Sequence, residues 1–354
     1  MKRRGRRFLA YSVGALAGAA AAGGLVRRRD GRRHDPARED HLGSLRGVPR
    51  VIRGPRATRL YTEWFPPTER ATGTVVLTHG YCLTEAVWHY QKRDLAGGPF
   101  GLVTWDLPGH GASPAPGRGH LTLDEAVESL AKVVEECATG DVVLAGHSLG
   151  GVITLGYLIR DRRPALERVR GVVLVNTPLQ HFAHAAAGRW PGASLEARAL
   201  GGAVQAAVAS DLFDRVLAKD VGTDDISGLS YRLVRWGFGK DPSPTQVRFI
   251  RDVIASVPPD VRADTFRIMT GWDFRPYLAQ VKVPALMVIG GRDRLVSPDE
   301  SRALAGLLPR GRVVVLPDAG HAAFLERPNS FNAELRRFAE RQFRKRVAQR
   351  AGSA

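Results

Sequence analysis

Three residues of the sequence could supply a nucleophile, an acid and a base, in that order along the chain. Ser148 lies in Gly-His-Ser-Leu-Gly, Asp293 in Gly-Gly-Arg-Asp, and His321 in Pro-Asp-Ala-Gly-His, and each segment follows a short apolar run. A serine hydroxyl is a poor nucleophile until a base removes its proton, and a histidine does this best when a carboxylate fixes its tautomer. If the three runs are parallel strands of one sheet, their following loops meet at one edge. The pattern therefore predicts acyl chemistry on the serine.

The residues around Ser148 predict a sharp turn from a strand into a helix. Residues 142–145 form an apolar run rich in β-branched side chains, which is typical of a strand buried on both faces of a parallel sheet. Apolar residues at helical spacing begin at Val152. Such a short turn strains the backbone of its central residue and leaves little room two positions away, where Gly146 and Gly150 stand. We therefore expect the serine hydroxyl at the tip of the turn.

Other residues compete for the roles of base and acid. His147 neighbours the nucleophile but is expected to point away from the tip of the turn. His79 and His110 lie on strand-end loops of their own, where we expect them to brace the backbone. Asp318 is the nearest rival for the acid because it shares a loop with the candidate base, and its alternative role is turn formation. We expect Asp293 to be the acid.

An acyl-transfer site also needs N–H donors aimed at the developing oxyanion. Leu149, directly after the nucleophile, offers one backbone N–H at the start of the helix. Tyr81, on the loop after the neighbouring strand, offers the second. We expect substrate contacts from this loop and from aromatic residues further along the chain: Cys82, Leu83, Trp190, Trp236 and Phe238.

Strands and helices alternate along most of the chain. Apolar runs predict strands near Val51 and at residues 60–62, 74–78, 102–105, 142–145, 172–175, 285–289 and 313–316. Helical patterns occur at residues 86–95, 123–137 and 328–345. This alternation predicts an α/β fold with a doubly wound, mostly parallel sheet, whose ligand sites lie at the carboxyl ends of the strands.

The alternation stops after the sixth expected strand. Residues 179–279 give helical patterns with scattered aromatic residues, most of which we expect to pack inside this segment. An insertion at a strand end must lie over the site, so the segment is expected to form a helical cap. The α/β core then comprises residues 59–178 and 280–345, after a linker at residues 34–58.

The net charge of +17 lies almost entirely at the two ends of the 354-residue chain. Residues 1–33 carry +9 and residues 335–354 carry +6, which leaves +2 for the body. Basic tails more often meet anionic lipid than a specific nucleic-acid site, and no nucleic-acid recognition motif is present, so we expect no nucleic-acid partner. The two cysteines, Cys82 and Cys137, predict neither a disulfide framework nor a zinc site, and no cofactor is expected.

The N-terminal segment is the main departure from a simple enzyme. Nineteen uncharged residues, 8–26, lie between arginines and are long enough to span a bilayer, although their alanines and glycines make the span weakly hydrophobic. Residues 6–9 resemble a twin-arginine export signal, but the arginines within residues 27–33 disfavour export. We expect residues 1–33 to anchor the protein in the cell membrane. A cleaved signal on a secreted protein and a soluble tail on a cytoplasmic one are the alternatives, and residues 346–354 form a second basic tail.

The motifs, taken in order, resemble those of the α/β-hydrolase superfamily. The matching segments are His79-Gly80-Tyr81, residues 106–113, residues 146–150, Gly291-x-Asp293, and Gly320-His321 with Glu326-x-Pro328. The resemblance covers about residues 50–345. It implies that Ser148 is the nucleophile, Asp293 the acid and His321 the base, and that Tyr81 and Leu149 are the oxyanion donors. Residues 79–83 with 88–89 are also similar to membrane-linked hydrolases of high-GC actinobacteria.

A serine at the turn separates this chain from haloalkane dehalogenases and epoxide hydrolases, which place an aspartate there to form an alkyl-enzyme ester. The chemistry left is acyl transfer, with an oxyanion held by backbone N–H groups and water releasing the acid. We expect a carboxylesterase or lipase that acts on an apolar acyl substrate under the cap. Cofactor-free haloperoxidases and C–C bond hydrolases share the triad and are enzymatic alternatives. A ligand-binding receptor on the same fold is the non-enzymatic one.

Overall fold

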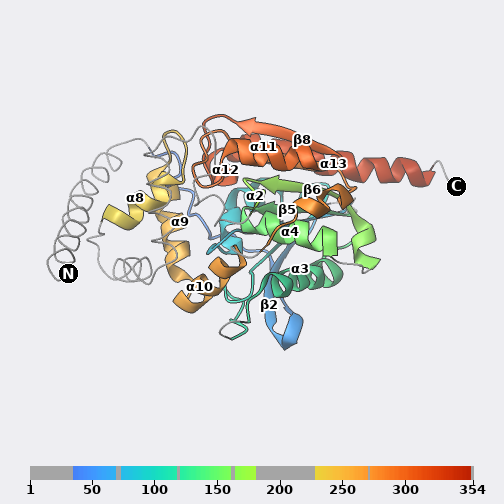
Figure 1. The fold of residues 1–354 in the computed structure, drawn as a ribbon, viewed down its shortest axis with the longest axis horizontal. Coiled ribbons are helices and arrows are strands. Elements are labelled where there is room, and N and C mark those ends of the chain that lie inside the picture. Colours follow the sequence, from blue (N-terminus) through green and yellow to red (C-terminus); the bar gives the residue numbers. More distant parts are fainter. Residues whose placement is uncertain are drawn as a thin grey trace, which may run out of the picture.

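The structure is a computed structural model that describes residues 35–68, 73–117, 120–160, 164–180, 228–269 and 272–351. Its central sheet, which helices flank in Figure 1, has the strand order β1-β2-β4-β3-β5-β6-β7-β8. The strands are β1 (Val48–Arg53), β2 (Arg59–Phe65), β3 (Thr74–Thr78), β4 (Gly101–Trp105), β5 (Val142–His147), β6 (Val169–Val175), β7 (Ala285–Gly290) and β8 (Gly311–Leu316). Strand β2 runs antiparallel to both neighbours, and the other pairs are parallel.

Helices cover both faces of the sheet, which makes it doubly wound. They are α2 (His89–Leu95), α3 (Leu123–Cys137), α4 (Leu149–Arg160), α11 (Pro298–Leu307), α12 (Ala323–Glu326) and α13 (Pro328–Ala351). Successive strand residues point to opposite faces. On one face Leu144 of β5 belongs to the same buried cluster as residues of α3, α4 and α11, and on the other its neighbour Val143 belongs to a cluster with residues of α2 and α13. The predicted fold class is confirmed.

Three helices of the predicted cap are described between β6 and β7. They are α8 (Gly228–Trp236), α9 (Pro244–Ser256) and α10 (Pro259–Ile268), and they lie together on one side of the sheet (Figure 1). The Ser243 side chain accepts the Gln246 N–H and so caps the start of α9. The insertion after the sixth strand is therefore helical where it is described. Residues 181–227, including Trp190, lie outside the described residues.

The structure corrects both ends of the predicted core. Residues 34–58 have the composition of a linker, but they contain β1, which pairs with β2 over its whole length. Further back, Asp35 accepts hydrogen bonds from Ser243 and from the Thr245 N–H (2.9 Å) at the start of α9. At the other end α13 continues to Ala351, beyond the predicted limit at residue 345.

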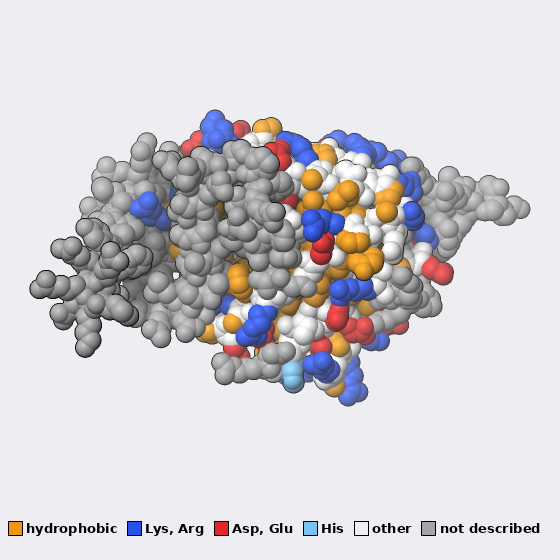
Figure 2. All heavy atoms as spheres, viewed as in Figure 1, with side chains coloured by type: hydrophobic (Ala, Val, Ile, Leu, Met, Phe, Trp, Pro, Cys, Tyr) orange, Lys and Arg blue, Asp and Glu red, His pale blue; other side chains and the backbone are white. Residues whose placement is uncertain are grey.

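The surface agrees with the near-neutral charge of the body. Basic and acidic side chains lie interspersed over much of the described part of the face in Figure 2. Among the residues that the structure describes, no helix has the length and apolar character needed to cross a membrane. The candidate anchor, residues 8–26, lies outside them. Short 3-10 helices complete the fold at Pro55–Ala57, Glu85–Trp88, Pro164–Arg168 and Arg275–Gln280.

Candidate active site

Ser148 occupies the tight turn between β5 and α4. Its φ of +51° lies in the left-handed region, which costs a non-glycine residue roughly 1–3 kcal/mol. A Cβ added to Gly146 would lie 2.4 Å from the Gly150 carbonyl oxygen, and one added to Gly150 would lie 2.3 Å from that of Thr78. Both distances are far shorter than van der Waals contact. The predicted strain at the serine and the need for glycine on either side are confirmed.

Asp293 and His321 form a hydrogen-bonded pair. The ring Nδ1–H of His321 donates to Asp293 Oδ2 at 2.8 Å, and the other carboxylate oxygen accepts the N–H groups of Leu295 (2.8 Å) and Val296 (3.0 Å). The Asp293 side chain is fully buried, and that of His321 is 16% exposed. Because a carboxylate oxygen can only accept here, the proton sits on Nδ1, and Nε2 is left as the proton acceptor.

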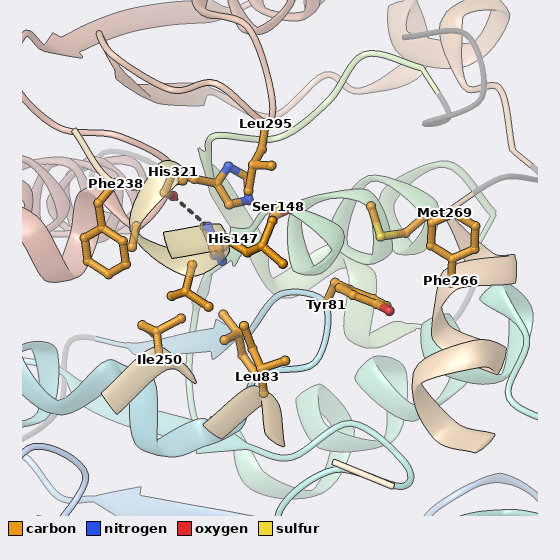
Figure 3. Close-up of a pocket in the computed structure, with 15 residues that line it drawn as sticks. Tyr81, Leu83, His147, Ser148, Phe238, Ile250, Phe266, Met269, Leu295 and His321 are labelled. Atoms are coloured by element: carbon orange, nitrogen blue, oxygen red, sulfur yellow. Dashed lines mark hydrogen bonds between the residues drawn. The ribbon is translucent and has the colours of Figure 1, made fainter. Parts of the chain in front are cut away.

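Ser148 lies beside this pair. Ser148 and His321 line the same pocket and are neighbours in Figure 3. Among the described residues no direct hydrogen bond joins the serine hydroxyl to the imidazole. Catalytic hydrogen bonds are often long in unliganded enzymes and shorten when substrate binds. The structure thus brings the three predicted side chains to one edge of the sheet.

The rival residues have other partners. Asp318 is half-exposed, and its carboxylate lies 3.4 Å from the Arg292 guanidinium. His79 and His110 are fully buried and bond the backbone, with His79 Nε2 accepting the Leu107 N–H at 3.0 Å. Burial lowers the pKa of both histidines, to about 4 for His110. Both are therefore neutral braces of the strand-end loops.

The two expected oxyanion donors lie on neighbouring strand-end loops. Leu149 is the first residue of α4, where backbone N–H groups have no acceptor within the helix. Tyr81 follows β3, which pairs with β5, and it lines the pocket together with Ser148. The positions fit the predicted roles, which remain predictions.

An apolar pocket surrounds Ser148. The cap contributes Val234 from α8, Ile250 from α9 and Phe266 from α10. In Figure 3, Phe238 and Phe266 lie on opposite sides of the serine, and Leu83 lies below it. The empty space between these residues, counted together with its opening to solvent, is about 1030 Å³. Within the described part of the chain, no three His, Cys, Asp or Glu residues are grouped so as to hold a metal ion.

Only some of the residues expected to contact the substrate line the pocket. Leu83 and Phe238 line the pocket. Cys82 does not, because its backbone has a φ of +50° and its side chain is fully buried in the core. Trp236 is half-buried outside the lining, because α8 turns Leu233 and Val234 toward the pocket instead.

Two residues that support His321 were missed. The His147 ring borders the pocket, and its Nε2–H donates to the His321 carbonyl oxygen at 2.9 Å, a role that was not expected from the sequence. Asn176, after β6, donates to the same oxygen at 2.6 Å and accepts the Gly290 N–H. Burial, with His321 nearby, lowers the pKa of His147 well below its usual value. Position after a strand was the only available signal for Asn176.

Two buried glutamates bind backbone N–H groups of the cap. Glu300 accepts from Leu179 at 3.0 Å, where the chain leaves β6 for the cap. Glu326 accepts from Gly239, between α8 and α9, at 2.7 Å, and from Gly320, next to the candidate base, at 2.9 Å. Burial raises the pKa of each carboxyl to about 7. Glu326 belongs to the Glu326-x-Pro328 motif, from which no role for this residue was predicted.

Comparisons with known proteins agree with this fold. A model of the alpha/beta hydrolase fold family matches residues 73–328. The pimeloyl-[acyl-carrier protein] methyl ester esterase of Stenotrophomonas maltophilia is 31% identical over 268 residues, which cover 75% of this chain and 92% of that protein. The esterase of Exiguobacterium antarcticum has a similar structure, with a TM-score of 0.67 and 19% identity over 84% of this chain and 100% of that chain. A bromoperoxidase from Bacillus anthracis also has a similar structure, with a TM-score of 0.65 and 20% identity over 82% of this chain and 99% of that chain. Since the family model spans most of its length, the chain belongs to the α/β hydrolase fold family.

Proposed function

We propose that the protein is a serine esterase that cleaves carboxylic esters of apolar acyl groups through an acyl-enzyme on Ser148. The observation that carries the proposal is the hydrogen bond between His321 and the buried Asp293, which leaves Nε2 as acceptor beside a strained serine. The relative from S. maltophilia is named as a methyl ester esterase, which supports ester cleavage. The apolar pocket walls support an apolar acyl group.

The reaction follows from the positions of these groups. His321 Nε2 takes the proton of Ser148 as Oγ attacks the ester carbonyl carbon. The resulting oxyanion accepts hydrogen bonds from the N–H groups of Tyr81 and Leu149, each worth roughly 10²–10³ in rate. When the tetrahedral intermediate collapses, the alcohol leaves with the proton from Nε2. Water then repeats the sequence on the acyl-enzyme, releases the acid and restores the serine.

A fluorophosphonate probe and a panel of nitrophenyl esters of increasing chain length test the proposal. The wild type should be labelled and should turn over the esters, and Ser148→Ala should lose both properties. Ser256→Ala, at the end of α9, is the matched control and should keep both. Labelling without ester turnover, combined with perhydrolysis of acetate by peroxide or cleavage of a vinylogous diketone, would replace the esterase by one of those activities. No labelling and no turnover would refute the proposal.

We also propose that residues 1–33 attach the enzyme to the cell membrane. The support is the uncharged segment 8–26 between clusters of arginines. Fractionation should place the full chain with membranes and a chain that begins at residue 34 in the supernatant. This truncation keeps Asp35 and its contacts with α9. Recovery of the full chain in the supernatant would refute the attachment.

A further inference from the structure

We propose that Glu326 is a positioning residue for His321 and that it acts by fastening the cap to the loop that carries this histidine. The two segments involved are the cap turn, residues 237–240 between α8 and α9, and the histidine loop, residues 317–321 after β8. The inference rests on the proposed function, because it concerns the base of the proposed reaction.

The carboxylate of Glu326 bridges the two segments. One oxygen accepts the Gly239 N–H of the cap turn at 2.7 Å, and the other accepts the Gly320 N–H of the histidine loop at 2.9 Å. The residue is 6% exposed. A buried carboxylate is tolerated only when its oxygens are hydrogen-bonded, and hydrogen bonds to a charged acceptor are among the strong ones. Each oxygen therefore holds a different unit of the protein.

The backbones of the two segments also bond directly. The His321 N–H donates to the Gly237 carbonyl oxygen at 2.7 Å, and the Lys240 N–H donates to that of Asp318 at 2.8 Å. A Cβ added to Gly239 would lie 2.1 Å from the Asp318 carbonyl oxygen. The segments are thus too close for a side chain between them. Glu326 adds a side-chain link between the same two segments through its bonds to Gly239 and Gly320.

The backbone of His321 is consequently shared between the cap and the core. Its carbonyl oxygen is held from the core by His147 and Asn176, whereas its N–H is held from the cap by Gly237. The ring faces Asp293 and Ser148 from this backbone. A shift of the cap turn therefore shifts the imidazole, and a misplacement of about 1 Å can cost about 10²-fold in rate.

The same turn also lines the pocket. Phe238 lies between Gly237 and Gly239, is 2% exposed and lines the same pocket as Ser148 (Figure 3). A substrate that presses on Phe238 acts on the segment that holds His321. Acyl groups that fill this side of the pocket are thus expected to affect kcat as well as KM.

Glu326→Gln tests the role, because it keeps the size of the side chain and turns one accepting oxygen into an NH₂ group that faces an N–H. We expect kcat for a short nitrophenyl ester to fall by about 10- to 100-fold with KM unchanged. Glu300→Gln is the matched control: it is equally buried and also binds the cap, but at Leu179, away from the histidine loop. It should lower stability with kcat unchanged. Asp318→Asn, on the surface of the histidine loop, should leave kcat unchanged.

A spectroscopic measurement makes the test independent of esterase activity. The Nδ1 proton of His321, assigned by its loss in His321→Gln, should give a downfield proton NMR signal that shifts or broadens in Glu326→Gln but not in Glu300→Gln. If Glu326→Gln does not fold, as judged by circular dichroism, Glu326→Asp takes its place. An unchanged signal and kcat in the folded variant would overturn the inference, as would an equal loss of kcat in Glu300→Gln. A changed signal in a protein without esterase activity would refute the proposed function and keep the inference.

Discussion

The strand-end loops and the cap helices form opposite walls of one pocket, and they are built in different ways. The loops after β5, β7 and β8 hold Ser148, Asp293 and His321 through a strained turn, a hydrogen bond between the His321 and Asp293 side chains, and hydrogen bonds from backbone N–H groups to Asp293. The walls from α8, α9 and α10 are apolar side chains. Geometry in the first wall is fixed by directional bonds, whereas the second requires only shape and hydrophobicity. We infer that the loops set the chemistry and the cap sets the choice of acyl group.

The largest effect is expected when the base is removed from the strand-end loops, which tests whether these loops determine the chemistry. His321→Gln should lower kcat by about 10⁴-fold or more, because it removes the Nε2 acceptor that takes the serine proton. KM for a medium-chain nitrophenyl ester should stay the same, since the apolar wall is intact. Steady-state kinetics measure both values. A kcat that falls only slightly would assign the base elsewhere.

The two candidate acids separate in the same assay. Asp293→Asn should lower kcat by about 10³–10⁴-fold, because the amide no longer fixes the Nδ1–H tautomer of the histidine. Asp318→Asn should change little, since Asp318 faces the Arg292 guanidinium at the surface. A larger loss in Asp318→Asn than in Asp293→Asn would contradict the assigned acid.

Changes in the cap wall should act on specificity. Ile250→Ala removes apolar surface from the pocket and should reduce kcat/KM for long-chain esters by about 10-fold, which corresponds to about 1.4 kcal/mol. Short-chain esters should be hydrolysed as before. Val253→Ala, on the same helix but outside the lining, is the matched control and should destabilise the protein without changing the preference. Equal losses for short and long esters would remove the assigned role of the cap.

Glu300 and Glu326, which join the cap to the core, should make the stability of the protein depend on pH. Burial raises the folded-state pKa of Glu300 and Glu326 from 4.5 to about 7, so the folded protein binds more protons than the unfolded chain between these values. Their contribution is complete below the unfolded pKa and is lost as pH rises through the folded pKa, by about 1–3 kcal/mol for each. When the free energy of unfolding is measured with urea from pH 4.5 to 8, it should fall less steeply with pH in Glu300→Gln than in the wild type. An unchanged slope would contradict the shift.

The sequence was sufficient for the parts that depend on local pattern. The helix at residues 123–137 and the turn at Ser148 could be predicted because their signals lie within a few neighbouring residues. Cys82 could not be placed, because the direction of its side chain depends on a positive φ that the sequence does not reveal. The support of the His321 carbonyl oxygen was also hidden, because Asn176 and His147 are 145 and 174 positions away and bind backbone rather than a recognisable side chain.

Composition misled where a segment is polar but packed. The arginines, prolines and glycines of residues 34–58 are typical of a linker, yet Asp35 binds the start of α9 and Ile52 is buried in the core. The cap itself could be recognised only as an interruption of the strand and helix alternation. Which of its side chains face the pocket depends on the packing of its helices against the loops.

The central claim is that the acyl group passes through Ser148. Its most direct test is mass spectrometry of the peptide that contains residue 148, after rapid acid quenching of the enzyme mixed with excess nitrophenyl ester. The account predicts an added mass equal to the acyl group on Ser148 in the wild type, and a more persistent adduct in a variant that deacylates slowly. Turnover of the ester with no adduct, or with the adduct on another residue, would contradict it.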